Sequence, residues 1–276
     1  MIWIILPAYN EEQALPGLFE SIDRELRAAG LVYTVVVVND GSRDETSAVL
    51  ARAAGRYPLE VVTHRINRGL WETIRDGFEF VAAHAVPTDI IVRMDADATH
   101  DPAVVPRMVA RMNEGFDVVI TSRYQRGGGQ TGLSLFRRFI SRCANLFLKT
   151  LFPVRGVWDY SCGFRAYRAE VIQKALEIYR NEFISLKGVG FTCTIEKLLR
   201  LREMGARFTA VPFVLRYDQK AGGSKMAPFL TTIGYFLLAA KVLYPWNPAA
   251  KEWRRKGREW REGRKEASEC RQPPAE

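Results

Sequence analysis

Short runs of consecutive apolar residues alternate with stretches whose apolar residues recur every three or four positions over residues 2–121. The apolar runs predict strands at residues 2–6, 32–38, 60–63, 90–94 and 118–121. The recurring pattern predicts helices between them, at residues 11–29, 44–57, 71–84 and 106–113. Strands that are apolar throughout are typical of a sheet buried on both faces. The pattern therefore predicts an α/β fold with a Rossmann-like, mostly parallel sheet and helices on both faces.

The pattern changes after residue 125, where arginine and three glycines form a predicted loop. A basic amphipathic helix is predicted at residues 134–152, followed by helices at 170–179 and 194–204 and a strand at 209–217. The apolar stretch from 226 to 248 is interrupted by proline, glycine and lysine, so it lacks the roughly 20 apolar residues of a spanning helix. We therefore predict one domain over residues 1–225, an apolar interfacial helix over 226–248 and a basic C-terminal tail over 249–276.

Composition narrows the class of partner. The chain has 276 residues, is 47% hydrophobic and carries a net charge of +9, which favours an anionic substrate, an acidic lipid or nucleic acid. Its four cysteines include no Cys-x-x-Cys pair, which argues against a zinc site and fits a reducing compartment. The apolar start is too short for a signal peptide, so we expect a cytoplasmic protein.

Acidic residues follow two of the predicted strands. Asp95 and Asp97 come directly after the run at 90–94, at the strand end where ligands bind in open α/β sheets. Carboxylate oxygens suit Mg²⁺ or Mn²⁺, and such an ion stabilises a departing diphosphate as a Lewis acid. Aspartates are also common in turns, and taken alone that interpretation would be preferred. The position at a strand end favours the metal site.

Asp40 follows the strand predicted at 32–38, where its carboxylate can accept hydrogen bonds from a nucleobase or ribose. The alternative is a helix cap or a turn, because residues 39–42 are rich in turn formers. Tyr9 can stack on a base or pack within a loop. Glu196, at a predicted helix start, can contact the substrate or stabilise the helix dipole.

The residue runs 7–11, 39–46 and 95–102 resemble glycosyltransferase family two, whose members have the GT-A fold. Later motifs at 122–124, 137–141, 163–168 and 223–225 follow in an order that resembles the dolichol-phosphate mannose synthase branch and its bacterial polyprenyl-phosphate relatives. The resemblance covers roughly residues 2 to 230. It implies an enzyme of the GT-A class with amphipathic interfacial helices in its C-terminal part.

The resemblance also implies roles for individual residues. Donor-binding residues would be Pro7, Tyr9, Glu11, Asp40, Asp95, Asp97, Arg216 and Lys225. Acceptor-binding residues would be Arg123, Arg137, Arg138, Ser141 and Asn145. The residues expected to act in catalysis through their charge are Asp97, Arg123, Arg216 and Lys225. Asp95 and Asp97 would hold the metal, and His100 resembles a position that can reach the metal region.

The chemistry of the basic helix at 134–152 supports a phosphorylated lipid as acceptor. Guanidinium groups bind phosphate bidentately, and phenylalanines on the same helix can contact an isoprenoid chain. The alternative is an ordinary helix with a solvated basic face. A second apolar segment at 229–243 favours the membrane surface. The sequence Gly222-Gly223-Ser224-Lys225 is either a lid over the donor phosphates or a linker.

These observations predict inverting transfer of a hexose, with mannose favoured, from a nucleotide-diphosphate sugar such as GDP-mannose to a polyprenyl phosphate. Because the second pKa of a phosphomonoester is about 6, such an acceptor needs no general base. The predicted partners are the donor, the acceptor lipid, an anionic membrane surface and a membrane-anchoring partner. We expect the protein to be peripheral at the cytoplasmic face of the membrane.

Two alternatives stay open at this point. The same fold could transfer sugar to a hydroxyl of a glycolipid or polysaccharide, in which case a catalytic carboxylate is required. A nucleic-acid-binding protein is a remote alternative supported by the basic residues at 251–265, but these are interleaved with glutamates and no nucleic-acid-binding motif is present. We therefore expect no nucleic-acid partner.

Overall fold

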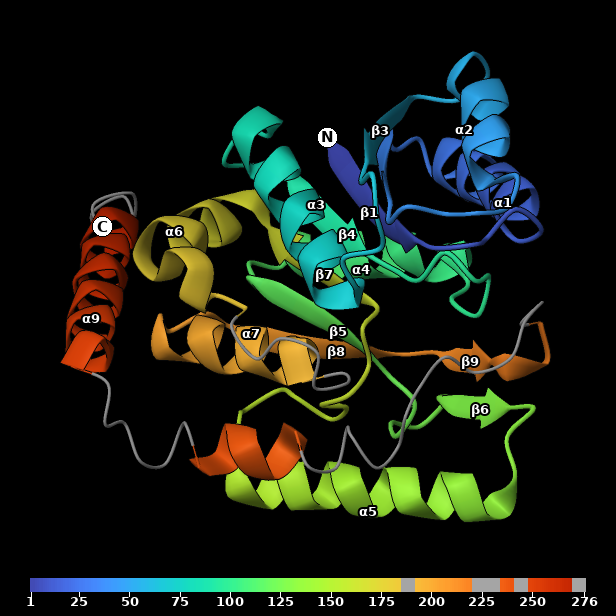
Figure 1. Cartoon of the computed structure of the whole chain (residues 1–276). Helices are drawn as coiled ribbons and strands as arrows, with labels where there is room; N and C mark the ends of the chain where they lie inside the picture. Colours follow the sequence, from blue (N-terminus) through green and yellow to red (C-terminus); the bar gives the residue numbers. More distant parts are fainter. Residues whose placement is uncertain (185–191, 220–233, 241–247, 270–276) are drawn as a thin grey trace.

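The computed structural model describes residues 1–184, 192–219, 234–240 and 248–269. At its centre is a seven-stranded sheet (Figure 1) in the order β3-β2-β1-β4-β7-β5-β8. The strands are β1 (Ile2–Ala8), β2 (Tyr33–Asn39), β3 (Leu59–Thr63), β4 (Ile90–Arg93), β5 (Val118–Ser122), β7 (Arg165–Arg168) and β8 (Phe208–Pro212). All neighbouring strands are parallel except that β7 is antiparallel to both β4 and β5.

Helices cover both faces of this sheet, as the sequence predicts. Side chains of α1 (Leu15–Ala28), α2 (Thr46–Ala54) and α4 (Val105–Asn113) share one hydrophobic core. Those of α3 (Leu70–His84), α5 (Leu135–Leu151), α6 (Ala169–Tyr179) and α7 (Thr192–Glu203) share the other. The described residues also include three short 3₁₀ helices, η1 (Pro102–Val104), η2 (Arg180–Glu182) and η3 (Tyr217–Gln219). The fold class is confirmed.

Burial on both faces explains why the inner strand β1 is apolar throughout. Every residue of β1 is buried, and its side chains alternate between the two cores, with Ile4 in one and Ile5 in the other. Helix α3 approaches this strand closely at Gly77, where an added Cβ would lie 2.6 Å from the side chain of Ile5. The helix therefore needs glycine at this point to pack on the sheet.

The strand predicted at 209–217 is divided into two. Residues up to Pro212 form β8 in the main sheet, whereas β9 (Val214–Arg216) pairs in parallel with β6 (Gly129–Thr131) in a separate two-stranded sheet. At Gly132, where φ is +74°, an added Cβ would lie 2.6 Å from the backbone nitrogen of Asp218. This close contact places the start of α5 beside the end of β9.

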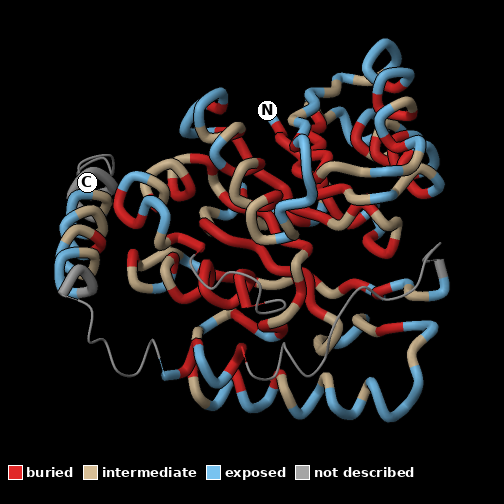
Figure 2. Tube along the Cα trace, in the orientation of Figure 1, coloured by how far each residue is buried: buried red, intermediate tan, exposed pale blue. Residues whose placement is uncertain are grey.

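Helix α5 lies along one edge of the molecule (Figure 1) and is mostly exposed (Figure 2). It begins after Ser134, whose hydroxyl accepts a hydrogen bond from the backbone of Arg137 at 3.4 Å, as an N-cap. Only Asn145 and Leu148 are buried among its 17 residues. Its exposed apolar side chains are Leu135, Phe136, Phe139, Ile140, Leu146 and Phe147. Residues 234–240 are helical and contact it, with the rings of Phe236 and Phe147 5.6 Å apart.

The C-terminal segment at 249–276, predicted to be a basic tail, forms helix α9 (Pro248–Glu269) over most of its length. This helix packs on α6 and α7, and Trp253 and Trp260 lie partly buried against the core. The guanidinium of Arg200 lies 5.0 Å from the Trp253 ring and 5.2 Å from the Tyr179 ring. The segment predicted as a basic tail thus forms a helix that packs against the domain.

Part of the predicted interfacial segment lies outside the described residues. Of residues 226–248, only 234–240 and Pro248 are described, and Lys225 is not among them. None of the described helices combines the length and apolar character that crossing a bilayer requires.

Candidate functional site

The two aspartates of the predicted metal site follow β4 at the carboxyl end of the sheet. Both oxygens of the Asp95 carboxylate face basic side chains, with Arg93 Nη2 2.6 Å from Oδ1 and His100 Nε2 3.6 Å from Oδ2. Asp97 Oδ1 accepts hydrogen bonds from the backbone and the hydroxyl of Thr99, at 3.2 and 2.6 Å. These contacts fix both carboxylates in one short turn, so that the site is organised before any ligand binds.

The buried side chain of His100 holds this turn in place by a hydrogen bond and a ring contact. Its Nδ1 accepts a hydrogen bond from the backbone of Asp95 at 2.9 Å, and its ring stacks on Phe164 with centroids 5.0 Å apart. Burial lowers the pKa of His100, which favours the neutral imidazole that an accepting Nδ1 requires. The residue that resembles a metal-region histidine therefore orients Asp95 in this structure.

Asp40 is buried at the end of β2 and anchors the loop that precedes α3. Its oxygens accept hydrogen bonds from the backbone of Arg68 (2.8 Å) and Gly69 (2.9 Å) and lie 2.7 Å from Nδ1 of His64. Burial by itself raises the pKa of Asp40, but the hydrogen bonds from Arg68, His64 and Gly69 outweigh it and lower that pKa below its ordinary value. The structure gives Asp40 a loop-fixing role, and its role in nucleoside binding stays a prediction.

The loop after β1 is joined to the loop after β2 by short hydrogen bonds. The backbone of Asn10 donates to Ser42 at 3.0 Å, and the backbone of Glu11 donates to Thr46 at 2.9 Å. Pro7 is buried within β1, whereas Tyr9 and Glu11 are partly exposed beside it. Since β2, β1 and β4 are neighbours in the sheet, their loops bring the predicted nucleoside residues to the same edge as Asp95 and Asp97.

Arg123 lies in a buried ion pair with Asp159, and its role in binding the acceptor phosphate stays a prediction. Its Nε and Nη2 donate to the two oxygens of that carboxylate at 2.7 and 2.9 Å, and Nη2 also donates to Ser161 at 2.7 Å. Burial raises the pKa of Asp159, but the charge and hydrogen bonds of Arg123 outweigh it and lower that pKa. Burial likewise lowers the pKa of Arg123, and Asp159 reverses the effect and raises it. The pairing of Arg123 with Asp159 was not predicted from the sequence.

Three of the predicted acceptor residues face inward from α5. Arg138 Nη2 donates to the carbonyl of Gln130 at 2.6 Å, and the Ser141 hydroxyl lies 2.8 Å from that of Tyr124. The Asn145 amide bridges the carbonyl of Trp158 and the backbone nitrogen of Tyr160, both at 2.9 Å. The spacing of residues 138, 141 and 145 puts them on one helix face. These side chains hold α5 against the domain, whereas the neighbouring Arg137 is exposed.

Arg216 connects the second sheet to the metal-site turn. Its backbone nitrogen donates to the carbonyl of Thr99 at 3.2 Å, while its exposed guanidinium donates to Asp218 at 3.1 Å. Strand β9 pairs with β6, which leads into α5. The turn at Asp95 and Asp97 and the start of α5 are therefore joined through β9. Lys225, predicted to act with Arg216, falls outside the described residues.

A group of buried cations behind Asp95 was not predicted from the sequence. Arg93 and Arg165 are register partners on β4 and β7, and Lys197 lies buried on α7. Burial above all, together with the charges of both arginines, lowers the pKa of Lys197 to about 7. Arg93 is the only charged residue in the run at 90–94, a signal that pattern analysis could have used. Glu196 is buried beside Lys197, not exposed in the first turn of the helix.

The residues present fit a divalent ion that is completed by substrate. Asp95 and Asp97 supply hard oxygen ligands at one strand end, and Mg²⁺ is commonly bound through one or two carboxylates together with substrate phosphates. Within the described part of the chain, no group of three or more histidine, cysteine, aspartate or glutamate side chains forms a metal cage. This donor set fits an ion shared with a diphosphate better than a permanently held structural ion.

Comparison with known proteins assigns the sequence to a protein family. The sequence profile of Glycosyl transferase family 2 matches residues 3–176, which include β1, β2, β4 and the turn at Asp95 and Asp97. The chain belongs to glycosyl transferase family 2. The expected resemblance is thereby confirmed.

Two curated relatives are glycosyltransferases named for lipid phosphates. The dolichol-phosphate mannosyltransferase of Pyrococcus furiosus is 31% identical over 235 residues, which cover 83% of this chain and 62% of the relative. The undecaprenyl-phosphate 4-deoxy-4-formamido-L-arabinose transferase of Pseudomonas fluorescens is 34% identical over 228 residues, covering 82% of this chain and 60% of the relative. The chain thus spans about three fifths of the length of these relatives.

The fold is shared with glucosyl-3-phosphoglycerate synthase from Mycobacterium tuberculosis, solved with Mn²⁺, uridine diphosphate and phosphoglyceric acid. That structure superimposes with a TM-score of 0.58 at 22% identity and covers 88% of this chain and 77% of its own. Crystals of the same enzyme with Mn²⁺ and UDP-glucose give a TM-score of 0.57. At this identity the likeness concerns the fold alone.

Proposed function

We propose that the protein transfers a hexose, with mannose favoured, from a nucleotide-diphosphate sugar to a polyprenyl phosphate, with inversion at the anomeric carbon. The proposal rests on the connection between the turn with Asp95 and Asp97, where the donor would bind, and helix α5, where the acceptor would bind. The turn with Asp95 and Asp97 is hydrogen-bonded through Thr99 to Arg216 on β9, and the partner of β9 leads into α5. A donor bound at the sheet edge would thus lie close to a helix suited to a lipid.

The donor end is argued from the strand-end loops. Asp95 and Asp97 would hold Mg²⁺ or Mn²⁺ together with the donor diphosphate, and such an ion supplies Lewis-acid stabilisation of the leaving group. Tyr9 and Glu11 lie on the loop tied to residues 42 and 46, where a nucleoside can be held. The exposed guanidinium of Arg216 adds positive charge at the same edge, where the leaving diphosphate would develop negative charge.

The acceptor is argued from its charge and from the relatives. A phosphomonoester is already largely ionised near pH 7, so the protein needs only to position its oxygen against the anomeric carbon. The names of both curated relatives include a polyprenyl-type phosphate. Arg137 is exposed at the start of α5 and can bind the phosphate, whereas Arg123 is held in its ion pair with Asp159.

Peripheral binding at the cytoplasmic membrane face is argued from the outer surface of α5. Six large apolar side chains are exposed along this helix, with Phe236 and Leu237 of residues 234–240 exposed beside them. Arg137, Arg142 and Lys149 lie on the same helix, and the Lys149 ammonium is 4.5 Å from the Trp158 ring. Such a mixture of apolar and cationic groups is typical of helices that lie in an anionic membrane interface.

The test is a donor screen with a lipid acceptor. The full chain is incubated with GDP-mannose, UDP-glucose and related donors, with polyprenyl phosphate and with Mg²⁺ or Mn²⁺, and labelled lipid is extracted. One donor should give a lipid-linked sugar that disappears when EDTA is added. A neutral glycolipid serves as the parallel acceptor. Transfer to the glycolipid alone, or full activity with EDTA, would contradict the proposal.

A further inference from the structure

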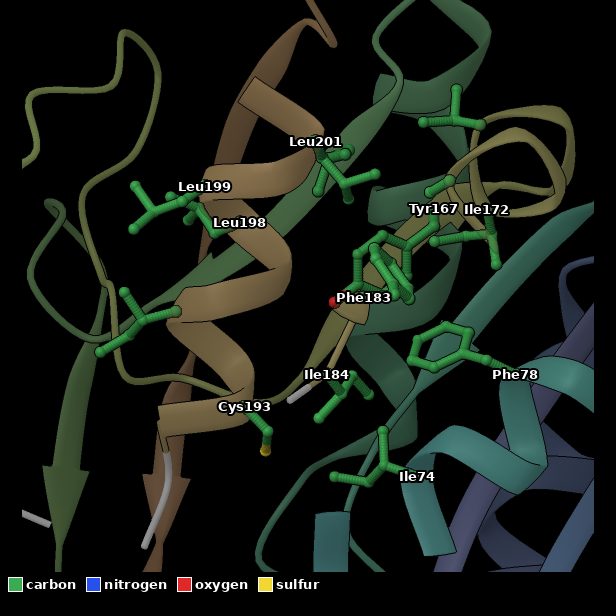
Figure 3. Close-up of a cluster of buried hydrophobic side chains, with 14 of the residues drawn as sticks. Ile74, Phe78, Tyr167, Ile172, Phe183, Ile184, Cys193, Leu198, Leu199 and Leu201 are labelled. Carbon is green, nitrogen blue, oxygen red and sulfur yellow. The ribbon is translucent and has the colours of Figure 1, made fainter. Parts of the chain in front are cut away.

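The strongest unassigned feature is the set of cations buried on the α3 side of the sheet. Arg93 (2% exposed), Arg165 (0%) and Lys197 (1%) come from β4, β7 and α7. The Lys197 ammonium lies 4.7 Å from the centroid of the Phe78 ring on α3. Figure 3 shows the hydrophobic core on this side of the sheet, to which α7 contributes Cys193 and Leu198 and α3 contributes Phe78 and Ile74. Such a concentration of buried positive charge needs a physical reason, because burying a charge is unfavourable.

Arg165 is explained by the fold. Its three nitrogens donate to the carbonyls of Cys162 (2.8 Å), Thr194 (2.9 Å) and Tyr160 (2.7 Å), so it joins the loop before β7 to the start of α7. Each of the three nitrogens therefore has an acceptor. Arg165 is a structural residue.

Arg93 is different, because part of its guanidinium lacks hydrogen-bond acceptors. Nη2 is 2.6 Å from Asp95 Oδ1, at ion-pair distance, yet neither Nη2 nor Nε makes a well-aligned hydrogen bond within the described residues. The guanidinium occupies the space beside Gly163, where an added Cβ would be 1.8 Å from Nη1. Gly163 thus leaves space for the Arg93 side chain, but the described residues supply no well-aligned hydrogen-bond acceptor for its Nε and Nη2.

The charges of the buried side chains behind Asp95 do not cancel when Lys197 is protonated. The acidic groups beside the cations are Asp95 and Glu196, since Asp159 is committed to Arg123. The sequences of residues 185–191, 220–233 and 241–247 contain neither aspartate nor glutamate, so none of these segments can supply the missing carboxylate. When Lys197 is protonated, three cations face two anions, which leaves an excess of positive charge directly behind the predicted metal ligand; when Lys197 is neutral, the charges balance.

We propose that Arg93 and Lys197 form an oxyanion-binding site behind Asp95, which holds a carboxylate on the transferred sugar or the phosphate of the acceptor. This inference rests on the proposed function for the identity of the ligand. A guanidinium with free N–H groups binds carboxylate or phosphate oxygens bidentately, and an ammonium beside it adds a point charge. Arg93 lies two residues before Asp95 and contacts it, so the proposed site adjoins the predicted metal ligand.

The state of Lys197 fits this role. With its pKa lowered to about 7, the side chain is largely neutral at pH 8 before an anion binds. An oxyanion placed beside it would favour the charged form, so that binding would take up a proton. A lysine that served only to fill space in the core would show no such coupling.

The experiment compares two donors that differ only in a carboxylate. Binding of UDP-glucose and UDP-glucuronate to the full chain is measured by titration calorimetry with Mg²⁺, without acceptor. GDP-mannose and GDP-mannuronate replace them if the screen selects guanine. If the oxyanion belongs to the sugar, the wild type should bind the acidic donor at least tenfold tighter and take up a proton. Lys197→Met should lose this preference and retain affinity for the nucleoside diphosphate.

A second arm tests the acceptor phosphate. If the oxyanion belongs to the acceptor, the donors bind alike, and Lys197→Met weakens binding of inorganic phosphate and polyprenyl phosphate to the donor complex at least tenfold. The matched control is Lys174→Met, which removes a partly exposed lysine paired with Glu177 on α6. Melting curves confirm that both variants fold. Arg93→Gln provides a second variant of the site.

The wild type alone can overturn the inference. If it neither prefers the acidic donor nor binds inorganic phosphate or polyprenyl phosphate in the presence of nucleoside diphosphate, the site does not exist, whatever the variants do. The same holds if Lys197→Met and Arg93→Gln fold and leave every affinity unchanged. Because these measurements record binding, they remain informative if no transfer is found, which would refute the proposed function separately.

Discussion

Polar side chains at the carboxyl end of the sheet are largely satisfied by the protein, whereas the outer face of α5 is turned toward solvent. Asp40 accepts two backbone hydrogen bonds and faces His64, and Arg123 lies in a bidentate pair with Asp159. On α5, Phe136 and Phe139 are 70% and 65% exposed. The sheet end is therefore preorganised for a defined ligand, while α5 presents a surface suited to an extended, apolar one.

The largest effect should come from the most preorganised point of the sheet end. Asp97→Asn keeps the shape of the turn but removes the charge that would hold the ion, so transfer should fall on the order of 1,000-fold, since ion-based charge stabilisation contributes several kcal/mol. The rate is measured with the donor selected by the screen. Asp101→Asn is the matched control, because asparagine retains the cap that Asp101 provides to Ala103. Equal rates for the two variants would remove the metal site from the proposal.

The contrast between two arginines gives the next effect. Asp159→Asn leaves the guanidinium of Arg123 buried without its counter-ion, and breaking a buried pair in this way costs about 3–5 kcal/mol. Arg137→Gln on the exposed start of α5 should change stability by less than about 0.5 kcal/mol and should raise the KM for the acceptor. Urea unfolding and acceptor titrations measure both.

The double variant Arg123→Met with Asp159→Leu tests the cause of the instability of Asp159→Asn. That instability comes either from losing the ion pair or from leaving the charge of Arg123 buried and unpaired. Removing both charges should be less destabilising than Asp159→Asn, since no charge is left buried alone. A double variant as unstable as the single one would mean that Arg123 stabilises the fold through packing instead of charge.

A smaller effect is expected from the exposed face of α5. Phe136→Ser with Phe139→Ser should reduce binding to vesicles containing anionic lipid at least tenfold, because inserting one phenylalanine into an apolar environment contributes about 1.5–3 kcal/mol. Co-sedimentation measures the bound fraction. Val32→Ser with Ile66→Ser is the control, since both residues are 72% exposed and lie away from α5. If both double variants lost binding equally, α5 would have no special role at the membrane.

The same contrast explains what the sequence could predict. Strands β1, β2 and β4 were found because burial on both faces leaves continuous apolar runs, and Asp95 and Asp97 were placed correctly at a strand end by position alone. Strand β7 was missed because its arginines break that pattern. The environment of Arg123 depends on a carboxylate 36 residues away, and no local pattern encodes such a contact.

Helix α9 shows a signal that was present but not used. Trp253 and Trp260 are seven residues apart, so they share one face of a helix, and both pack against the core. The composition of this segment favoured a solvated tail because charged residues dominate it. The spacing of two large apolar residues was the better guide, since two tryptophans on one face are enough to dock a helix whose other faces are charged.

Lys197 is the exception at the sheet end, and it gives the smallest predicted effect. Its pKa in the folded protein is about 7, below its value of 10.5 in the unfolded chain. Between these values the unfolded chain holds a proton that the folded protein lacks, so the free energy of unfolding should rise with pH, by at most about 1.4 kcal/mol from pH 7.5 to 8.5. Urea unfolding at both pH values measures the rise, and Lys197→Met should show less of it than Lys174→Met. A saturating acidic donor or inorganic phosphate should also reduce the rise in the wild type, because a bound oxyanion restores the proton to the folded state. A rise of equal size in both variants would place its origin elsewhere in the chain, and a rise that no oxyanion alters would leave Lys197 as a buried lysine that binds nothing.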